Sequence, residues 1–167
     1  MDEQQKYPQD AEGFTYVTNA LMETINLYPG LLPGERFEFS MMPENTVLSV
    51  IASSGSFIVE EHVSITDHVW QTCAYPFMVV FRASGLNSKR KAEAKEWMDT
   101  LAEWLCRKAV KIKGETYKLA KWPKLEGDRR ISLISRQTAA YLGGENEDKS
   151  ENWVMDMVIQ YTNEFDR

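Results

Sequence analysis

Residues 153–162, with the sequence WVMDMVIQYT, decide the fold class because their apolar side chains alternate along the chain. Neighbouring side chains of a β-strand point to opposite faces, so every second residue shares a face. One face of this stretch consists of Trp153, Met155, Met157, Ile159 and Tyr161. The other face mixes valines with polar residues. The pattern predicts a strand with one face in the core and one face that is partly polar.

A second long strand is predicted over residues 67–83. Its segment 77–81, FMVVF, is apolar at every position, which favours a central strand covered on both faces. Pro76 has no backbone N–H for a strand ladder, so we expect a bulge or a sheet edge there. Shorter strands are predicted over residues 46–52 and 57–59, with residues 53–56 as a hairpin turn between them.

Two helices are predicted from apolar stripes at helical spacing. Asp10 is a suitable N-cap for the first helix, and Tyr28-Pro29-Gly30 ends it. Ser88 opens the second helix. The stripes consist of Phe14, Val17, Leu21, Met22 and Ile25 in the first helix, and of Trp97, Leu101, Trp104 and Leu105 in the second.

The C-terminal part is predicted to return to β-structure. Residues 117–122 and 129–138 suggest a hairpin around Gly127-Asp128, and residues 143–148 suggest a flexible acidic loop. This order of elements predicts an α+β fold with a mainly antiparallel sheet and two principal helices packed on it. The 167 residues fit a single domain over 1–167, with residues 1–10 as a loose N-terminal arm.

The N-terminus is polar and acidic, and no run of about 18 apolar residues occurs. We therefore expect neither a secretory signal nor a transmembrane helix. Cys73 and Cys106 are the only cysteines, and we expect both to be reduced, buried thiols of an intracellular protein.

Residues suited to catalysis are sparse. His62 and His68 would share one face of a continuous strand, but a zinc site needs at least three converging ligands, so we expect two exposed imidazoles. Residues 53–56 lack the frame of a nucleophile elbow, and Gly143-Gly144 lacks the lysine of a phosphate-binding loop. The sequence therefore predicts no catalytic residue, no metal, no cofactor and no enzyme activity.

Charge is distributed unevenly along the chain, whose net charge is −6. Residues 1–84 carry 3 basic and 11 acidic side chains, residues 85–136 carry 14 and 7, and residues 137–167 carry 2 and 7. An acidic surface of one subunit meeting a basic surface of the next would guide head-to-tail association. The basic segment could instead contact DNA through its interleaved lysines and aromatic residues, or be a solvated surface.

Several stretches together resemble the tail terminator family of long-tailed bacteriophages, whose members are often labelled minor capsid proteins. These stretches cover most of residues 14–163: the helix 14–28, residues 57–61 (FIVEE) leading into 77–82, the helix 88–106 with its EWMD and EWL segments, residues 131–142, and the closing strand 153–161.

The resemblance implies a structural protein of the virion neck, at the top of the tail, assembled in the host cytoplasm. Such proteins form a hexameric ring on the head-proximal end of the tail tube, stop its polymerisation and offer a surface for head-completion proteins. The expected partners are therefore further copies of this chain, the tail tube protein and head-completion or neck proteins. DNA would pass through the opening without sequence-specific binding, and no membrane would be involved.

Two groups of residues are candidates for contacts in such a ring. The basic residues Lys89, Arg90, Lys91, Lys118, Lys121 and Lys124 are hypothesised to lie at a subunit or partner interface. The predicted loop with Gly143, Gly144, Glu145, Glu147 and Asp148 is hypothesised to face the lumen or the tube, where acidic residues would repel DNA phosphates. The alternatives are another neck or head-completion connector, or a small-ligand or nucleic-acid-binding module that uses the basic segment.

Overall fold

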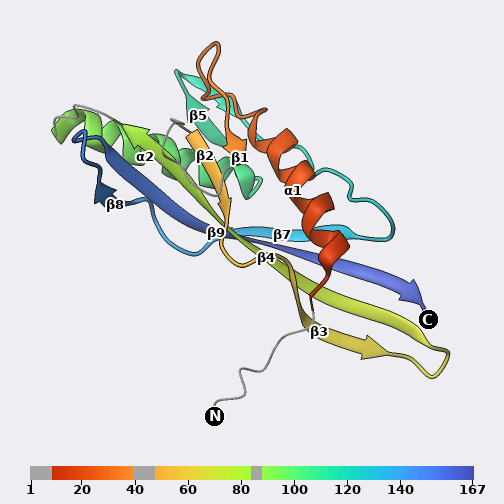
Figure 1. The fold of residues 1–167 in the computed structure, drawn as a ribbon. Helices are drawn as coiled ribbons and strands as arrows, with labels where there is room; N and C mark the ends of the chain where they lie inside the picture. The colour runs from red at the N-terminus through yellow and green to blue at the C-terminus, as the bar shows by residue number, and fades with distance from the viewer. Residues whose placement is uncertain (1–8, 40–47, 84–87) are drawn as a thin grey trace.

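The computed structural model describes residues 9–39, 48–83 and 88–167, which form two helices, one large sheet and a small hairpin (Figure 1). The helices are α1 (Ala11–Ile25) and α2 (Ser88–Leu105). The sheet contains β1 (Glu38–Phe39), β2 (Leu48–Ala52), β3 (Phe57–Val63), β4 (His68–Ala83), β7 (Arg130–Arg136), β8 (Tyr141–Glu145) and β9 (Glu151–Asp166). The small hairpin consists of β5 (Val110–Ile112) and β6 (Glu115–Tyr117). All sheet pairs except β1–β2 are antiparallel, which confirms the predicted α+β class.

Two 16-residue strands, β4 and β9, form the centre of the sheet. They pair antiparallel over their full length, from His68 opposite Asp166 to Ala83 opposite Glu151. Each carries two short strands in line along its outer edge: β2 and β3 lie on β4, and β7 and β8 lie on β9. The long central pair therefore positions nearly every other strand.

The predicted hairpin turn at residues 53–56 is instead a step between two strands in line. β2 ends opposite Phe77 and β3 begins opposite Ala74, so both run antiparallel to β4 and the chain does not reverse. Pro76 lies at this step, where its carbonyl accepts a hydrogen bond of 3.0 Å from the Ser53 N–H. The irregularity expected at Pro76 is thus the gap between β2 and β3, on the edge of β4 that these strands occupy. Such a gap tolerates a residue without a backbone N–H.

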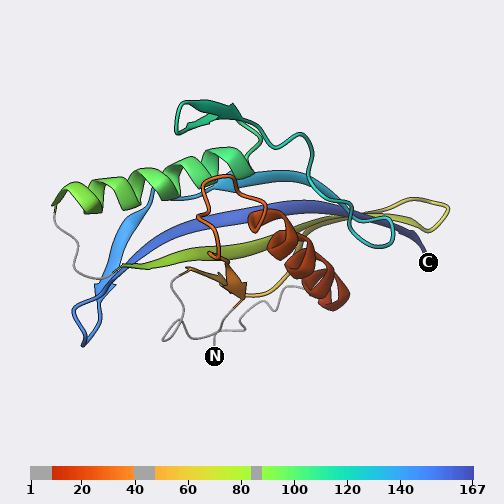
Figure 2. The same ribbon diagram turned by 90° about the horizontal axis from the view of Figure 1, so that it is seen from above.

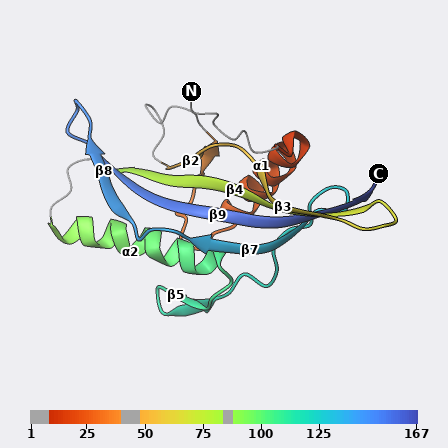
Figure 3. The same ribbon diagram turned by 90° about the horizontal axis from the view of Figure 1, so that it is seen from below.

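Both helices pack on one face of the sheet (Figures 2 and 3). The odd-numbered residues of β4 and β9 form this face, which confirms the core face predicted for residues 153–161. On β4 and β9 the core cluster includes Cys73, Tyr75, Phe77, Val79, Trp153, Met155, Met157, Ile159 and Tyr161. The predicted helical stripes contribute Val17, Leu21, Ile25, Leu101, Trp104 and Leu105.

The other face of the sheet carries the even-numbered residues of β4 and β9. In the described part of the chain no helix or second sheet covers it (Figure 3), so the prediction that residues 77–81 are covered on both faces is wrong. Val80 is nevertheless only 5% exposed, because it lies between Ser49 of β2 and Val154 of β9 on neighbouring strands.

Two further predictions for the C-terminal half are wrong. The predicted hairpin around Gly127-Asp128 does not form, because the chain reverses earlier, between β5 and β6, at Lys113-Gly114. Residues 118–129 contain no strand, and Pro123 interrupts the run that suggested one.

The predicted acidic loop is also ordered as a strand in its first half. Gly143, Gly144 and Glu145 belong to β8, which pairs with β9, and Glu147 and Asp148 lie in the tight turn that follows. Of the predicted loose N-terminal arm, residues 1–8 lie outside the described residues, whereas Asp10 is buried and caps α1.

Candidate functional site

The basic residues proposed as an interface fall into two groups. Lys89, Arg90 and Lys91 lie in the first turn of α2, and their side chains lie outside the described residues. Lys118, Lys121 and Lys124 are exposed on the strand-free connection between β6 and β7. The structure therefore does not assign the two groups to one surface.

Lys121 and Lys124 line a pocket of about 640 Å³, which we call the basic pocket. Five of its lining side chains are cationic and none is acidic. Aromatic and aliphatic residues make up most of the rest. The lining consists of Arg107, Lys121, Trp122, Pro123, Lys124, Leu125, Gly127, Arg129, Arg130 and Ile131. A surface of this kind suits an acidic partner that also presents apolar side chains.

Arg107 and Trp122 fix one wall of the basic pocket to the end of α2. The Arg107 guanidinium donates to the carbonyl of Ala120 at 2.6 Å and lies 5.2 Å above the Trp122 ring. The indole Nε1 of Trp122 in turn donates to the Leu105 carbonyl at 2.9 Å. Lys121, Lys124 and Arg130 remain exposed, so their charges are accessible to a partner.

Behind this pocket, Asp10 joins three parts of the chain that are distant in sequence. Its carboxylate accepts hydrogen bonds of 3.0 Å from Gly13 N–H, from Tyr161 OH and from both Nε and Nη2 of Arg129. The Tyr161 hydroxyl also bonds to Ser56. Burial by itself would raise the pKa of the Asp10 carboxyl, but these donors outweigh it, and the pKa lies below the ordinary value of 3.8.

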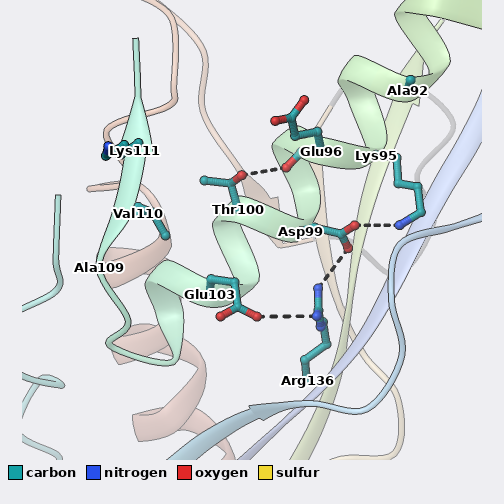
Figure 4. A pocket seen from close by; sticks show the side chains of 10 residues that line it. All are labelled: Ala92, Lys95, Glu96, Asp99, Thr100, Glu103, Ala109, Val110, Lys111 and Arg136. Carbon is teal, nitrogen blue, oxygen red and sulfur yellow. Dashed lines mark hydrogen bonds and ion pairs between the residues drawn. The ribbon is translucent and has the colours of Figure 1, made fainter. Parts of the chain in front are cut away.

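A second polar cluster surrounds Asp99 on α2 (Figure 4). One carboxylate oxygen accepts from Arg136 and from the Ala140 N–H, both at 3.0 Å, and the other accepts from Lys95 at 2.6 Å. Ala140 lies at the step between β7 and β8, so Asp99 satisfies a backbone donor that the interrupted ladder leaves unpaired. Although Asp99 lines a pocket of about 500 Å³, its contacts are those of a structural residue.

The β3–β4 hairpin and the end of β9 extend past both helices (Figure 2). We call residues 60–71 and 163–167 the projecting hairpin. Val63, Val69 and Phe165 lie opposite one another in a cross-strand row on the helix-side face. Val69, in the middle of the row, is fully buried, whereas Val63 is 46% exposed and Phe165 is 36% exposed. This part of the sheet thus presents apolar side chains to solvent.

The tip of the projecting hairpin is a hydrogen-bonded turn that carries a fully exposed isoleucine, Ile65. Ser64 closes the turn: its N–H donates to the His68 carbonyl at 2.8 Å, and its hydroxyl accepts from the His68 N–H at 3.0 Å. Asp67 adopts a positive φ of 59°, which aspartate tolerates better than most residues. Together with Val63 and Phe165 behind it, Ile65 makes the end of the hairpin an exposed apolar surface.

The two histidines do not share a continuous strand, because the hairpin turn separates them. His62 Nε2 lies 2.8 Å from Glu60 Oε1, and His68 Nδ1 lies 2.6 Å from Asp166 Oδ1. Within residues 9–39, 48–83 and 88–167, no group of three or more His, Cys, Asp or Glu side chains could hold a metal ion.

The cysteines have the chemistry of buried thiols. Cys73 is fully buried and Cys106 half-buried, and neither forms a disulfide. Burial raises the pKa of Cys73 to about 11, with a further contribution from the Asp10 carboxylate, and burial also raises the pKa of Cys106. Both thiols are therefore protonated near neutral pH and are poor nucleophiles.

Comparison with known proteins does not assign the chain to a family. No protein-family model matches the chain, and no curated protein matches it significantly. Among the residues that the structure describes, no helix is both long and apolar enough to cross a membrane.

Sequence reasoning missed the projecting hairpin and three cations of the basic pocket, Arg107, Arg129 and Arg130. A signal for the tip was present, because Ile65 stands in the polar turn sequence Ser64-Ile65-Thr66-Asp67, where an apolar β-branched residue is uncommon. Arg107 and Arg130 could be grouped only by the fold, since 23 positions separate them in sequence.

Proposed function

We propose that this chain is a structural virion protein that acts as a tail terminator of a long-tailed phage. Copies of the chain form a ring at the head-proximal end of the tail tube, stop the polymerisation of tube subunits and provide the surface that the head joins. This assignment begins from the similarity of residues 14–163 to that family.

The observation that supports the proposal is the presence of two surfaces of opposite charge on one chain. The projecting hairpin is acidic and presents exposed apolar residues, and the basic pocket presents exposed cations beside apolar residues. A chain with two different, complementary surfaces associates head to tail, and such contacts close into a ring when the rotation between subunits allows it.

Deletion of the gene in its parent phage or prophage tests the proposal. Negative-stain electron microscopy of the induced lysate is expected to show overlong or variable tail tubes beside unjoined, DNA-filled heads. Tails of uniform length with leaking or empty heads would instead assign the chain to head completion. Normal virions would refute a structural role in the neck.

The cationic lining of the basic pocket favours a nucleic-acid-binding module as a second candidate function. Its exposed lysines and Trp122 could contact phosphates and bases. Fluorescence anisotropy with short single- and double-stranded DNA tests this candidate. Salt-sensitive binding by the isolated monomer that Lys121→Glu/Lys124→Glu abolishes would support it, whereas equal binding by that variant would exclude the pocket as the DNA site.

A further inference from the structure

We propose that the tip of the projecting hairpin of one subunit docks in the basic pocket of the next copy of this chain. The inference deepens the proposed function and rests on it, because it identifies the two surfaces that join neighbouring subunits of the ring. Its occupant is a second copy of the chain, for the reasons of charge, shape and reach given below.

The charges of the two surfaces are complementary. The projecting hairpin carries Glu60, Glu61, Asp67, Glu164 and Asp166 against a single arginine, Arg167. That arginine already pairs with Glu61 at 3.1 Å. The exposed cations of the pocket, Lys121, Lys124 and Arg130, lie among lining residues that include no acid. The pairing of opposite surfaces orients the encounter of two subunits.

The apolar parts of the two surfaces also correspond. Ile65 stands at the tip, with Val63 and Phe165 behind it on one face. The pocket offers the half-buried side chains of Trp122 and Ile131. Insertion of Ile65 between them would remove its side chain from water, and an apolar centre surrounded by charges is the usual composition of a protein interface.

The base of the hairpin adjoins the basic pocket of its own chain, but the tip extends past it. Glu164 and Phe165 share a neighbouring pocket with Gly127 and Arg129, two residues that also line the basic pocket. β7 begins at Arg130 opposite Thr162, whereas β9 continues to Asp166, paired with β4 throughout, so the tip lies beyond the end of β7. Because the tip and the pocket are different surfaces, a contact between the tip of one copy and the pocket of another is heterologous.

Two variants with defects on opposite surfaces test the contact. Ile65→Asp places a charge at the tip and leaves the pocket intact, whereas Lys121→Glu/Lys124→Glu reverses the pocket and leaves the tip intact. We expect each variant to weaken self-association about thirtyfold in sedimentation velocity and mass photometry, while far-UV circular dichroism stays unchanged because all three positions are exposed. One matched control is Leu27→Asp, at another exposed apolar position. The other is Lys111→Glu/Lys113→Glu, at two exposed lysines outside the lining of the basic pocket; both controls should associate like the wild type.

Mixing the two defective variants gives the decisive result. Each is expected to be monomeric alone, but a 1:1 mixture should form a heterodimer, since one chain supplies an intact tip and the other an intact pocket. A chain that combines Glu60→Lys/Glu164→Lys with Lys121→Glu/Lys124→Glu should regain association. A mixture that stays monomeric, or variants that associate like the wild type, would overturn the inference.

The outcomes separate this inference from the proposed function. A wild-type chain that remains monomeric at about 1 mM would overturn the hairpin contact, but not the ring, which a tube could template. A wild-type two-fold dimer that both variants disrupt would support the contact and overturn the ring. If Lys121→Glu/Lys124→Glu abolishes DNA binding but leaves self-association unchanged, the pocket is a nucleic-acid site and the inference is wrong.

Discussion

The guanidinium of Arg129 donates two parallel hydrogen bonds to Asp10, from Nε to Oδ2 and from Nη2 to Oδ1, both at 3.0 Å. The side chains are 10% and 8% exposed, so this bidentate ion pair is largely removed from water. It connects the residue that directly precedes α1 to the residue that directly precedes β7. A buried pair of this kind matters mainly through the cost of breaking it, because the remaining charge loses its buried partner. Without Asp10, Arg129 would keep only the exposed Glu12, at 3.7 Å.

Removal of either partner is therefore expected to destabilise the fold. Asp10→Asn and Arg129→Met should each lower the free energy of unfolding by about 3 kcal/mol, measured by urea denaturation. The loss of unfolding free energy in the double variant should be at least about 1 kcal/mol smaller than the sum of the two single losses. The reason is that the double variant leaves neither charge buried without the other. Lys108→Ala, which removes an exposed ion pair with Glu103, is the control and should change stability by no more than about 0.5 kcal/mol. Additive losses would show that the two residues do not act as a pair.

The same pair should make stability depend on acidity. The folded pKa of Asp10 lies below its value of 3.8 in an unfolded chain, so the carboxylate contributes its full stabilisation above 3.8 and loses it as the pH falls through the folded pKa. Wild-type urea midpoints should therefore fall steeply below about pH 4. The Asp10→Asn variant should show a shallower fall, with the remainder due partly to Asp99, whose pKa is also lowered. Parallel profiles for the two proteins would contradict this assignment.

Gly13→Ala should reverse the usual effect of a glycine-to-alanine change inside a helix. Such a change ordinarily stabilises a protein by up to about 1 kcal/mol. At Gly13, however, the new Cβ would overlap the Asp10 carboxylate and the Tyr161 hydroxyl. We expect a loss of about 3 kcal/mol in urea denaturation, because the cap and the buried network are displaced together. Asn19→Ala, at an exposed position of α1, is the control and should be neutral or slightly stabilising. A stable Gly13→Ala variant would refute the close approach of these groups.

The two thiols should resist modification in the folded protein. With a pKa of about 11, Cys73 has roughly one thiolate per thousand molecules at pH 8, and it is also fully buried. Reaction with 5,5′-dithiobis(2-nitrobenzoate) at pH 8 should therefore release about one equivalent slowly, from half-buried Cys106, and a second only in denaturant. A Cys106→Ser variant isolates Cys73. Rapid labelling of that variant in the folded state would contradict the structure.

The long strands and both helices could be predicted because local patterns specify them. The alternation in residues 153–161 marks the buried face of β9, and the spacing of Leu101, Trp104 and Leu105 marks that of α2. Asp10 was identifiable as a cap from its position before an apolar stripe. Its bonds to Arg129 and Tyr161 were not, because those partners lie 119 and 151 residues away in sequence.

Strand pairing was the part that local sequence could not supply. Residues 53–56 have the composition of a hairpin turn, but a 16-residue β4 provides an edge long enough for β2 and β3 in line. Gly143 and Gly144 likewise indicated a loop, although both belong to β8, in which Gly144 pairs with Asn152 of β9 and Gly143 lies at a bulge. In both cases a long partner strand outweighs the local preference.

The central place of β9 also governs how the chain folds during its synthesis. β9 leaves the ribosome after every other strand of the sheet, yet it pairs with β4, β7 and β8 and supplies Tyr161 to the cap of α1. Until it emerges, the apolar face of β4 and the stripes of both helices have no complete core to enter. The nascent chain must therefore keep these surfaces from aggregating until residues 151–166 have left the ribosome.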